Sequence, residues 1–294
     1  MSTDQPSRLE AMVATNAGMR DLIQSQIRQI DECLHSLVLD RDGVRALPKG
    51  DKEVFDVITT MIHMVGISGH SILKLTEKTD MGVRDAFPLA RSIIEGVVNV
   101  CFIMAEGVEA AQKASRHAEV RAFRDLKRTW EIAGMSLSVS HSGQLPPAEV
   151  ARLESMLPEF TTKRGSERDW TDKTLKQRLE TIAQKFSSST MTVLNGSAFN
   201  IYRHASEIVH GSYFSARYFW GLTLPGRQRP TSRDDLMLML ADHQFSVLMS
   251  TAFAYVGLLE CFAAYVDNPN LAGEAKFQLE RIRELPAIAE ALRT

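Results

Sequence analysis

Apolar residues recur with the period of an α-helix along most of this 294-residue sequence, and this periodicity restricts the chain to helical folds. The clearest segments are residues 8–40, 51–78 and 234–266, where apolar side chains are three or four positions apart. No segment of convincing length alternates apolar and polar residues as a half-buried β-strand does. We therefore predict an all-α protein, a multi-helix bundle of long antiparallel helices.

The helix boundaries follow from caps, glycines and prolines. The expected helices span residues 8–40, 51–78, 83–105, 109–132, 172–186, 197–210, 234–266 and 271–292, with a short helix from the prolines at 146–147 to about 156. Polar breaks lie near 134–147, 158–170 and 224–230. Because these breaks are too short to argue for separate domains, residues 1–294 are expected to form a single helical domain.

The net charge of -2 hides a local excess of basic residues. Residues 113–233 carry 19 basic and 11 acidic side chains, which favours an anionic ligand. The alternative is that folding scatters these charges over several faces. Cys33, Cys101 and Cys261 are too far apart in the sequence to form a disulfide framework or a zinc site. Since the N-terminal residues also lack a signal-peptide pattern, we expect a cytoplasmic protein.

Neither a membrane span nor a cofactor site is expected. The uncharged stretch Phe245–Leu259 has 15 residues, fewer than the roughly 20 that cross a bilayer. We expect it to lie in the core or in a dimer interface. The sequence has no metal-ligand spacing and no glycine-rich phosphate loop, so no metal and no cofactor are expected.

The segment Tyr202–Ser212 places several polar residues on an otherwise apolar helix. Arg203 and His210 are seven positions apart and so point to the same side, with Ser206 and Glu207 between them. A permanent cation beside an imidazole that titrates near neutrality suits phosphate chemistry. The alternative is a helix-terminal histidine that interacts with the helix dipole before the following glycine.

Arg203, His204 and His210 resemble the signature of the HEPN (higher eukaryotes and prokaryotes nucleotide-binding) superfamily. In that signature an arginine, commonly followed by Asn, Asp or His, precedes a histidine after four to six intervening residues. Members are α-helical, usually dimeric, and often metal-independent ribonucleases of toxin and antiviral systems. The resemblance implies these catalytic residues: Arg203, His210, His204 and Ser206. Arg28 and His35 have the same spacing, but a glutamine follows that arginine and departs from the fuller pattern.

Two helices also resemble those of an uncharacterised bacterial all-helical family, with one helix reading RSxxE and the other YxxxSExxH. This resemblance implies one polar site with these supporting residues: Arg91, Glu95, Tyr202 and Glu207. Because Arg91 and Glu95 lie on an apolar helix, we expect both to cluster with Arg203 and His210. The alternative is a buried structural network that fixes the register of the two helices.

Four basic residues fall on one face of the expected 109–132 helix and could hold an RNA backbone. They are His117, Arg121, Arg124 and Arg128. A solvated face paired with acidic residues is the alternative. Aromatic residues with one arginine follow at Tyr213–Trp220, where they could stack on bases or contribute to the core or a dimer interface.

Together these features favour a metal-independent, RNA-cleaving, HEPN-like homodimer, a toxin or antiviral-defence effector. In that hypothesis His210 activates the ribose 2′-hydroxyl or protonates the leaving group, and Arg203 stabilises the phosphate charge. His204 and Ser206 orient these groups. An antitoxin or another partner protein is a candidate partner. The alternative is a non-enzymatic helical module that binds a small anionic ligand, a nucleotide or a partner protein.

Overall fold

The computed structural model describes residues 7–38, 51–126, 128–138, 145–223, 226, 228–286 and 288. Within these residues the chain is mostly helical, which confirms the predicted all-α class. The helices are α1 (Arg8–Val38), α2 (Lys52–Leu75), α3 (Val83–Glu106), α4 (Val108–Asp125), α5 (Pro147–Met156), α6 (Leu175–Lys185), α7 (Ser188–Val209), α8 (Tyr213–Phe219), α9 (Arg233–Val266) and α10 (Pro269–Glu284). A 3₁₀ helix, η1 (Leu157–Phe160), follows α5.

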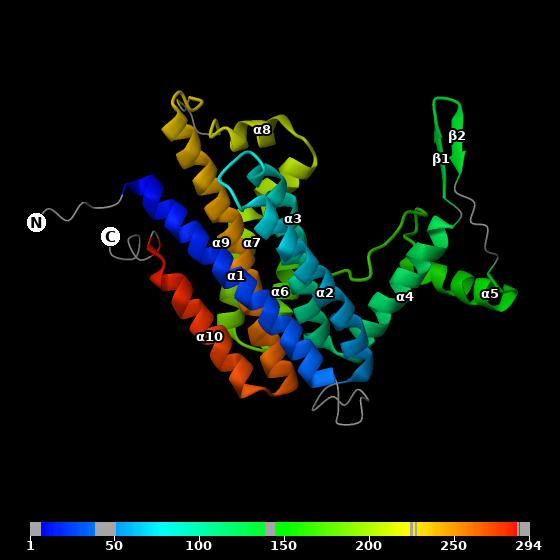
Figure 1. The fold of residues 1–294 in the computed structure, drawn as a ribbon. Helices are drawn as coiled ribbons and strands as arrows, with labels where there is room; N and C mark the ends of the chain where they lie inside the picture. Colours follow the sequence, from blue (N-terminus) through cyan, green and yellow to red (C-terminus); the bar gives the residue numbers. More distant parts are fainter. Residues whose placement is uncertain are drawn as a thin grey trace, which may run out of the picture.

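The long helices pack side by side in a bundle around α9 (Figure 1). Helix α9 packs against α1, α3, α7 and α10, so its buried residues face in every direction. The stretch Phe245–Leu259 lies within α9, and its position in the core confirms one of the two expected locations.

Two helices, α3 and α9, are long and apolar enough to cross a membrane by length and composition alone. Their most apolar windows are 61% and 78% buried inside the bundle, respectively. Core helices of a bundle pass the same test, because burial among other helices also requires an apolar surface on all sides.

The expected helix over residues 109–132 ends early, and a β-hairpin replaces its second half. Helix α4 ends at Asp125, and β1 (Thr129–Ile132) pairs antiparallel with β2 (Met135–Ser138). Ala133 and Gly134 form the two-residue turn with φ of 50° and 81°, as a primed hairpin turn requires. The prediction of no strands is wrong here. Strands of four residues are too short for their alternation to stand out.

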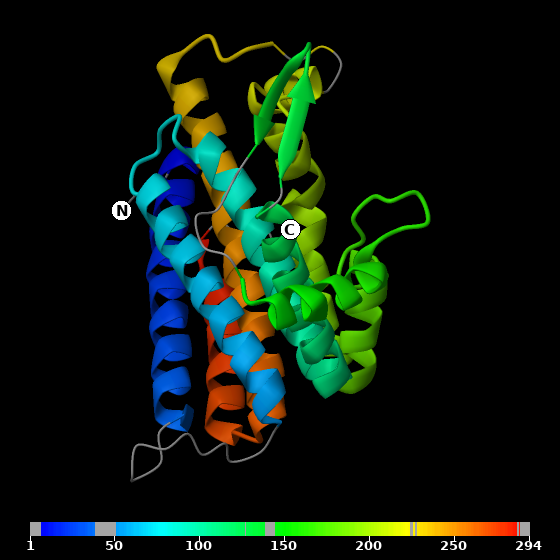
Figure 2. The ribbon, with the colours of Figure 1, turned by 90° about the vertical axis from the view of Figure 1, so that its right-hand side faces the viewer.

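Helix α4 leads away from the bundle and carries α5 and the hairpin near its far end (Figures 1 and 2). Its first part packs against α2 and α3, whereas its later part contacts α5 and η1. Helices α3 and α7, which carry Arg91 and Arg203, belong to the bundle. The expected basic stripe lies outside it, on α4.

Candidate functional site

Three polar residues of α3 and α7 form one network inside the bundle. Arg91 Nη2 lies 3.3 Å from Glu95 Oε1 and 3.5 Å from the Tyr202 hydroxyl oxygen. The guanidinium carbon of Arg91 lies 4.6 Å from the centre of the Tyr202 ring. The Tyr202 hydroxyl donates a hydrogen bond to Glu95 Oε1. Each partly buried charge therefore has a partner.

The network favours the charged form of Arg91 and the protonated form of Tyr202. Burial opposes the charge on Arg91, but the Glu95 carboxylate and the Tyr202 hydroxyl outweigh it and raise the pKa of the guanidinium. Burial, together with the Glu95 carboxylate, raises the pKa of the Tyr202 hydroxyl. Because that hydroxyl stays protonated at neutral pH, it can keep donating to Glu95 and joining α7 to α3.

The expected cluster of this network with Arg203 and His210 does not form. No hydrogen bond or ion pair between described side chains joins Arg203 or His210 to Arg91 or Glu95. His210 lies eight residues after Tyr202, which separates the two backbone positions by about 12 Å along the helix axis. Arg203 follows Tyr202 directly, so it points about 100° further round the helix.

Arg203 and His210 instead lie on an outer surface formed by the end of α7 and the start of α8. Both side chains are exposed, as are those of Tyr213 and Phe214. The guanidinium carbon of Arg203 lies 5.9 Å from the centre of the Phe214 ring, within the range of a cation–π contact. We call these four residues the α7–α8 surface. It combines a cation, an imidazole and two aromatic rings.

Two local motifs fix the turn that positions this surface. Gly211 has a φ of 62°, and the N–H groups of Gly211 and Ser212 donate to carbonyls in the last turn of α7 at 3.1 and 3.3 Å, as in a Schellman motif. The Ser212 hydroxyl caps α8 and donates to Glu207 Oε2 at 2.6 Å. Glu207 thus ties α7 to α8. His210 ends α7, where its imidazole can interact with the helix dipole.

His204 is half-buried beneath the α7–α8 surface and packs against the aromatic residues of α8, including Phe214 of that surface at 6.2 Å between ring centroids. Its ring lies parallel to Tyr218 with centroids 3.9 Å apart, and Tyr218 contacts His243 of α9 at 5.5 Å. The His243 Nε2–H donates to the carbonyl of Phe219 at 2.8 Å. Burial lowers the pKa of both histidines. We call His204, Tyr218 and His243 the histidine–aromatic cluster.

His204 is half-buried in this position. Its Nδ1 is buried and has no hydrogen-bond partner among the described residues. Ser206, the other residue expected to orient the site, is half-buried. Of the four expected catalytic residues, the structure exposes Arg203 and His210 on the same surface.

The protein is expected to lose stability as the pH falls below about 6.5, because of the histidine–aromatic cluster. Its two histidines have an ordinary pKa of 6.5 and a lowered pKa in the fold. Between these values the unfolded chain binds more protons, so stability present above pH 6.5 is lost as the pH falls through the folded pKa. Urea unfolding at pH 7.5 and 5.5 measures this loss. Replacing His204 and His243 by glutamine should reduce it, whereas replacing the exposed His35 by glutamine should not. An unchanged pH dependence in the first variant would contradict the assignment.

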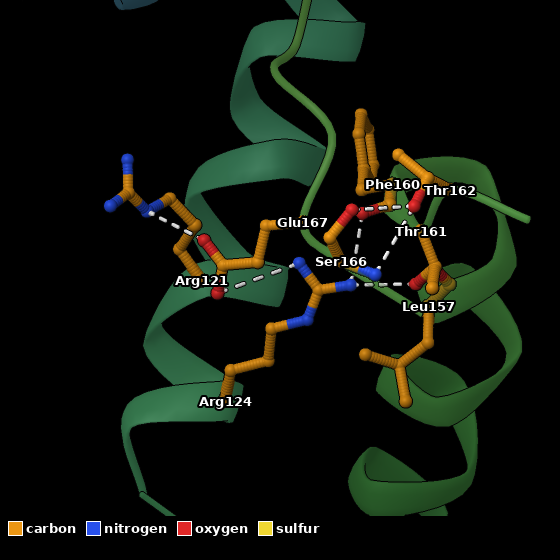
Figure 3. Close-up of polar contacts among 8 residues, drawn as sticks. All are labelled: Arg121, Arg124, Leu157, Phe160, Thr161, Thr162, Ser166 and Glu167. Carbon is orange, nitrogen blue, oxygen red and sulfur yellow. Dashed lines mark hydrogen bonds and ion pairs between the residues drawn. The ribbon is translucent and has the colours of Figure 1, made fainter. Parts of the chain in front are cut away.

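Two members of the expected basic stripe on α4 bind the protein itself. Arg124 Nη2 donates to the Phe160 carbonyl at 2.9 Å and to the Thr161 hydroxyl at 2.7 Å (Figure 3). Its Nη1 lies 3.7 Å from Glu167 Oε1. His117 is buried, with its ring centre 5.1 Å from that of Phe160. Both residues therefore hold segment 157–167 on α4.

The expectation of a single exposed stripe is thus wrong. Segment 157–167 folds back over α4, and the sequence spacing on α4 gives no sign of this. Arg121 stays largely exposed and lies 4.0 Å from Glu167 (Figure 3). Arg128 is also exposed, but it follows the end of α4. Arg121 and Arg128 are the members that remain open to an anionic ligand.

Replacing Arg124 with alanine is expected to loosen segment 157–167. Hydrogen bonds from a charged donor contribute about 2 kcal/mol, so amide exchange in this segment should become about 30-fold faster. Hydrogen–deuterium exchange at Thr161, Thr162 and Arg168 reports this opening, since their N–H groups are hydrogen-bonded there. Arg121→Ala is the matched control and should change exchange little. Equal effects of the two variants would refute this role of Arg124.

A groove lies beside Arg203, between α6 and α7. It has a volume of about 540 Å³ and a mainly apolar lining. The lining residues include Leu175, Leu179, Met191, Ala198, Phe199, Tyr202 and Arg203. Phe199 lines the groove, and 85% of this residue's surface is exposed. Within the described residues, no three His, Cys, Asp or Glu side chains lie close enough to hold a metal ion.

The fold and these surfaces define an all-helical protein with an exposed arginine–histidine–aromatic surface next to a structural polar network. The chain belongs to DUF5677, a family of unknown function, whose model matches residues 70–226, slightly more than half of the chain. The matched residues contain both the Arg91–Glu95–Tyr202 network and the α7–α8 surface. No curated protein and no solved structure shows a significant match.

Proposed function

We propose that this protein binds single-stranded RNA on the α7–α8 surface and cleaves it without a metal ion. The observation that supports this best is the joint exposure of Arg203 and His210 on a surface that also carries Tyr213 and Phe214. Aromatic rings stack on unpaired bases, and arginine neutralises phosphate. The resemblance of Arg203, His204 and His210 to the HEPN signature supports the same activity.

In this proposal His210 is the proton-transfer group. It removes the proton of a ribose 2′-hydroxyl or delivers a proton to the leaving 5′-oxygen. The 2′-oxygen attacks the adjacent phosphorus, the bond from phosphorus to the 5′-oxygen breaks, and a 2′,3′-cyclic phosphate and a 5′-hydroxyl result. The guanidinium group of Arg203 stabilises the negative charge that develops on the phosphate oxygens. Water at the exposed surface restores the protonation state of His210.

Other described residues have supporting roles in this proposal. Glu207 and Ser212 fix the turn that orients His210 relative to α8. The network of Arg91, Glu95 and Tyr202 holds α7 against α3 and so contributes to the stability of the fold. Arg121 and Arg128, the exposed members of the expected stripe, contribute to the path of the RNA backbone.

Incubation of the purified protein with single-stranded RNA in excess EDTA tests the proposal. Cleavage is expected in EDTA and should not increase when Mg²⁺ replaces EDTA. Fully double-stranded RNA of the same sequence is the control and should be cleaved much less, because its bases are stacked and cannot reach Tyr213 or Phe214. Cleavage that requires Mg²⁺, or no cleavage of either RNA, would argue against the proposal.

The groove beside Arg203 favours a second function, non-enzymatic binding of a small anionic ligand. The groove is lined mainly by apolar residues, and its charged lining residues are Lys176, Glu180 and Arg203. The two cations suit a molecule that has an apolar part and a carboxylate or phosphate. Binding of such a ligand should be weakened by Arg203→Ala and unaffected by His210→Ala. That pattern, in a protein that does not cleave RNA, would favour this second function.

A further inference from the structure

The β-hairpin has one face that is entirely apolar and exposed. Trp130 pairs with Leu137, and Ile132 pairs with Met135, so these four side chains share one face of the hairpin. Between 55% and 66% of each residue's surface is exposed. The opposite face is polar and carries Thr129, Glu131, Ser136 and Ser138. This division is typical of a sheet that covers an apolar surface on one side.

The rest of the described chain does not cover this face. Figure 1 shows the hairpin standing away from the bundle. β1 and β2 pack against each other and make no comparable contact with another described element. Since a two-stranded hairpin alone is only marginally stable in water, a surface that covers its apolar face would stabilise it.

A second uncovered surface lies on α2. Residues 57–73 contain no Asp, Glu, Lys or Arg, although one side of this helix faces outwards. We call that side the α2 face; it exposes Thr60, His63, Met64, Ile67 and His70. Met64 borders a cavity of about 220 Å³ between α2 and α3. Exposed helix faces usually carry charged residues, so this face has the composition of a covered one.

We propose that the hairpin of one copy of this chain docks on the α2 face of a second copy, and the reverse, in a symmetric dimer. A twofold interface of this kind buries two identical pairs of complementary surfaces. Figure 2 shows α2 and the hairpin on the same side of the molecule. Two copies related by a twofold axis can therefore each place the hairpin on the α2 face of the other. Neither surface carries an Asp, Glu, Lys or Arg side chain that docking would have to desolvate.

The areas of the two surfaces favour reciprocal docking over the packing of two hairpins on each other. At roughly 150 Å² for a large side chain, the four exposed side chains of the hairpin offer on the order of 400 Å². Packing two hairpin faces against each other would bury about 800 Å², below the lower limit of about 1,200 Å² for a stable interface. Reciprocal docking buries two hairpin faces and two α2 faces, about 1,600 Å², which is the usual size of a specific interface.

Disulfide trapping tests the pairing of the two surfaces. Chains with Trp130→Cys and chains with Met64→Cys are mixed and oxidised, each with Cys33→Ser; the buried Cys101 and Cys261 are kept. A covalent dimer of about 66 kDa, twice the chain mass of 32.8 kDa, is expected in the mixture and in neither variant alone.

The polar face of the hairpin provides the matched control. Ser136→Cys should not cross-link to Met64→Cys, because Ser136 points away from the docked surface. A dimer formed by Trp130→Cys alone would show that hairpins pack on each other. A cross-link within one chain that carries both cysteines would show that the hairpin folds onto its own α2. Either result, or no cross-link at all, overturns the proposal.

Light scattering gives a second readout that does not depend on trapping. The unmodified protein should be a dimer at micromolar concentration. Trp130→Ser with Leu137→Ser should raise the dissociation constant about 30-fold or more, with an unchanged circular dichroism spectrum because both side chains are exposed in the single chain. Glu131→Gln should leave the dimer intact. A monomer mass for the unmodified protein, or a dimer that survives the double substitution, overturns the proposal.

Discussion

Replacing His210 with alanine is expected to slow RNA cleavage by a factor of about 10²–10⁴, the contribution that a positioned general acid or base makes. Arg203→Ala should slow it by about 10²–10³, since it removes the charge that stabilises the phosphate. Both side chains are exposed, so the free energy of unfolding should change by less than about 1 kcal/mol. Rates on a labelled single-stranded RNA and urea unfolding of the same samples separate the two effects.

The chain contains a matched control for this experiment. Arg28 and His35 on α1 have the same seven-residue separation, and His35 lies in the last turn of its helix, near the C-terminal end as His210 does. Alanine at both control positions should leave the cleavage rate unchanged. Activity that persists in His210→Ala, or that is lost in the control, would show that the spacing alone does not define the site.

Glu95→Ala is expected to lower the free energy of unfolding by about 2–3 kcal/mol. The substitution removes the acceptor of the Tyr202 hydroxyl and the ion partner of Arg91, so a partly buried guanidinium keeps only Tyr202. The side chains of Arg91 and Glu95 are 23% and 37% exposed, and solvent therefore reduces the cost below that of a fully buried pair. Urea unfolding at pH 7.5 measures the change.

Two further measurements distinguish a structural network from a catalytic one. Glu109→Ala, at an exposed position in the first turn of α4, should change the free energy of unfolding by less than about 0.5 kcal/mol. The cleavage rate of the remaining folded Glu95→Ala protein should equal that of the unmodified protein, because Glu95 contacts Tyr202 about two helical turns from His210. Loss of cleavage without loss of stability would instead make Glu95 part of the catalytic site.

The helices that are apolar over many turns could be predicted from the sequence. α1, α3 and α9 begin and end within a few residues of the expected positions, because burial imposes a regular apolar spacing on them. α7 begins at Ser188, nine residues before the expected start at 197. Its first turns are rich in Ser and Thr, which resemble a loop, yet the Ser187 hydroxyl caps the helix by accepting from the Thr190 N–H.

The candidate site could be predicted only where it depends on neighbours along one helix. The shared exposure of Arg203 and His210 follows from helical spacing. The histidine–aromatic cluster depends on how α7, α8 and α9 pack, because it brings the distant His243 next to Tyr218. No spacing in the sequence predicts this contact. The partners of Arg124 could not be predicted either, because they belong to segment 157–167 and not to its own helix.

The identity of the RNA ends left by the unmodified protein tests the central claim most directly. Mass spectrometry of a single-stranded RNA cleaved in EDTA should find 2′,3′-cyclic phosphate or 3′-phosphate ends opposite 5′-hydroxyl ends, because the ribose 2′-oxygen is the nucleophile when His210 acts without a metal ion. Fragments with 5′-phosphate and 3′-hydroxyl ends, formed only when Mg²⁺ is present, would mean that metal-activated water is the nucleophile, and would contradict the proposed role of His210 and Arg203.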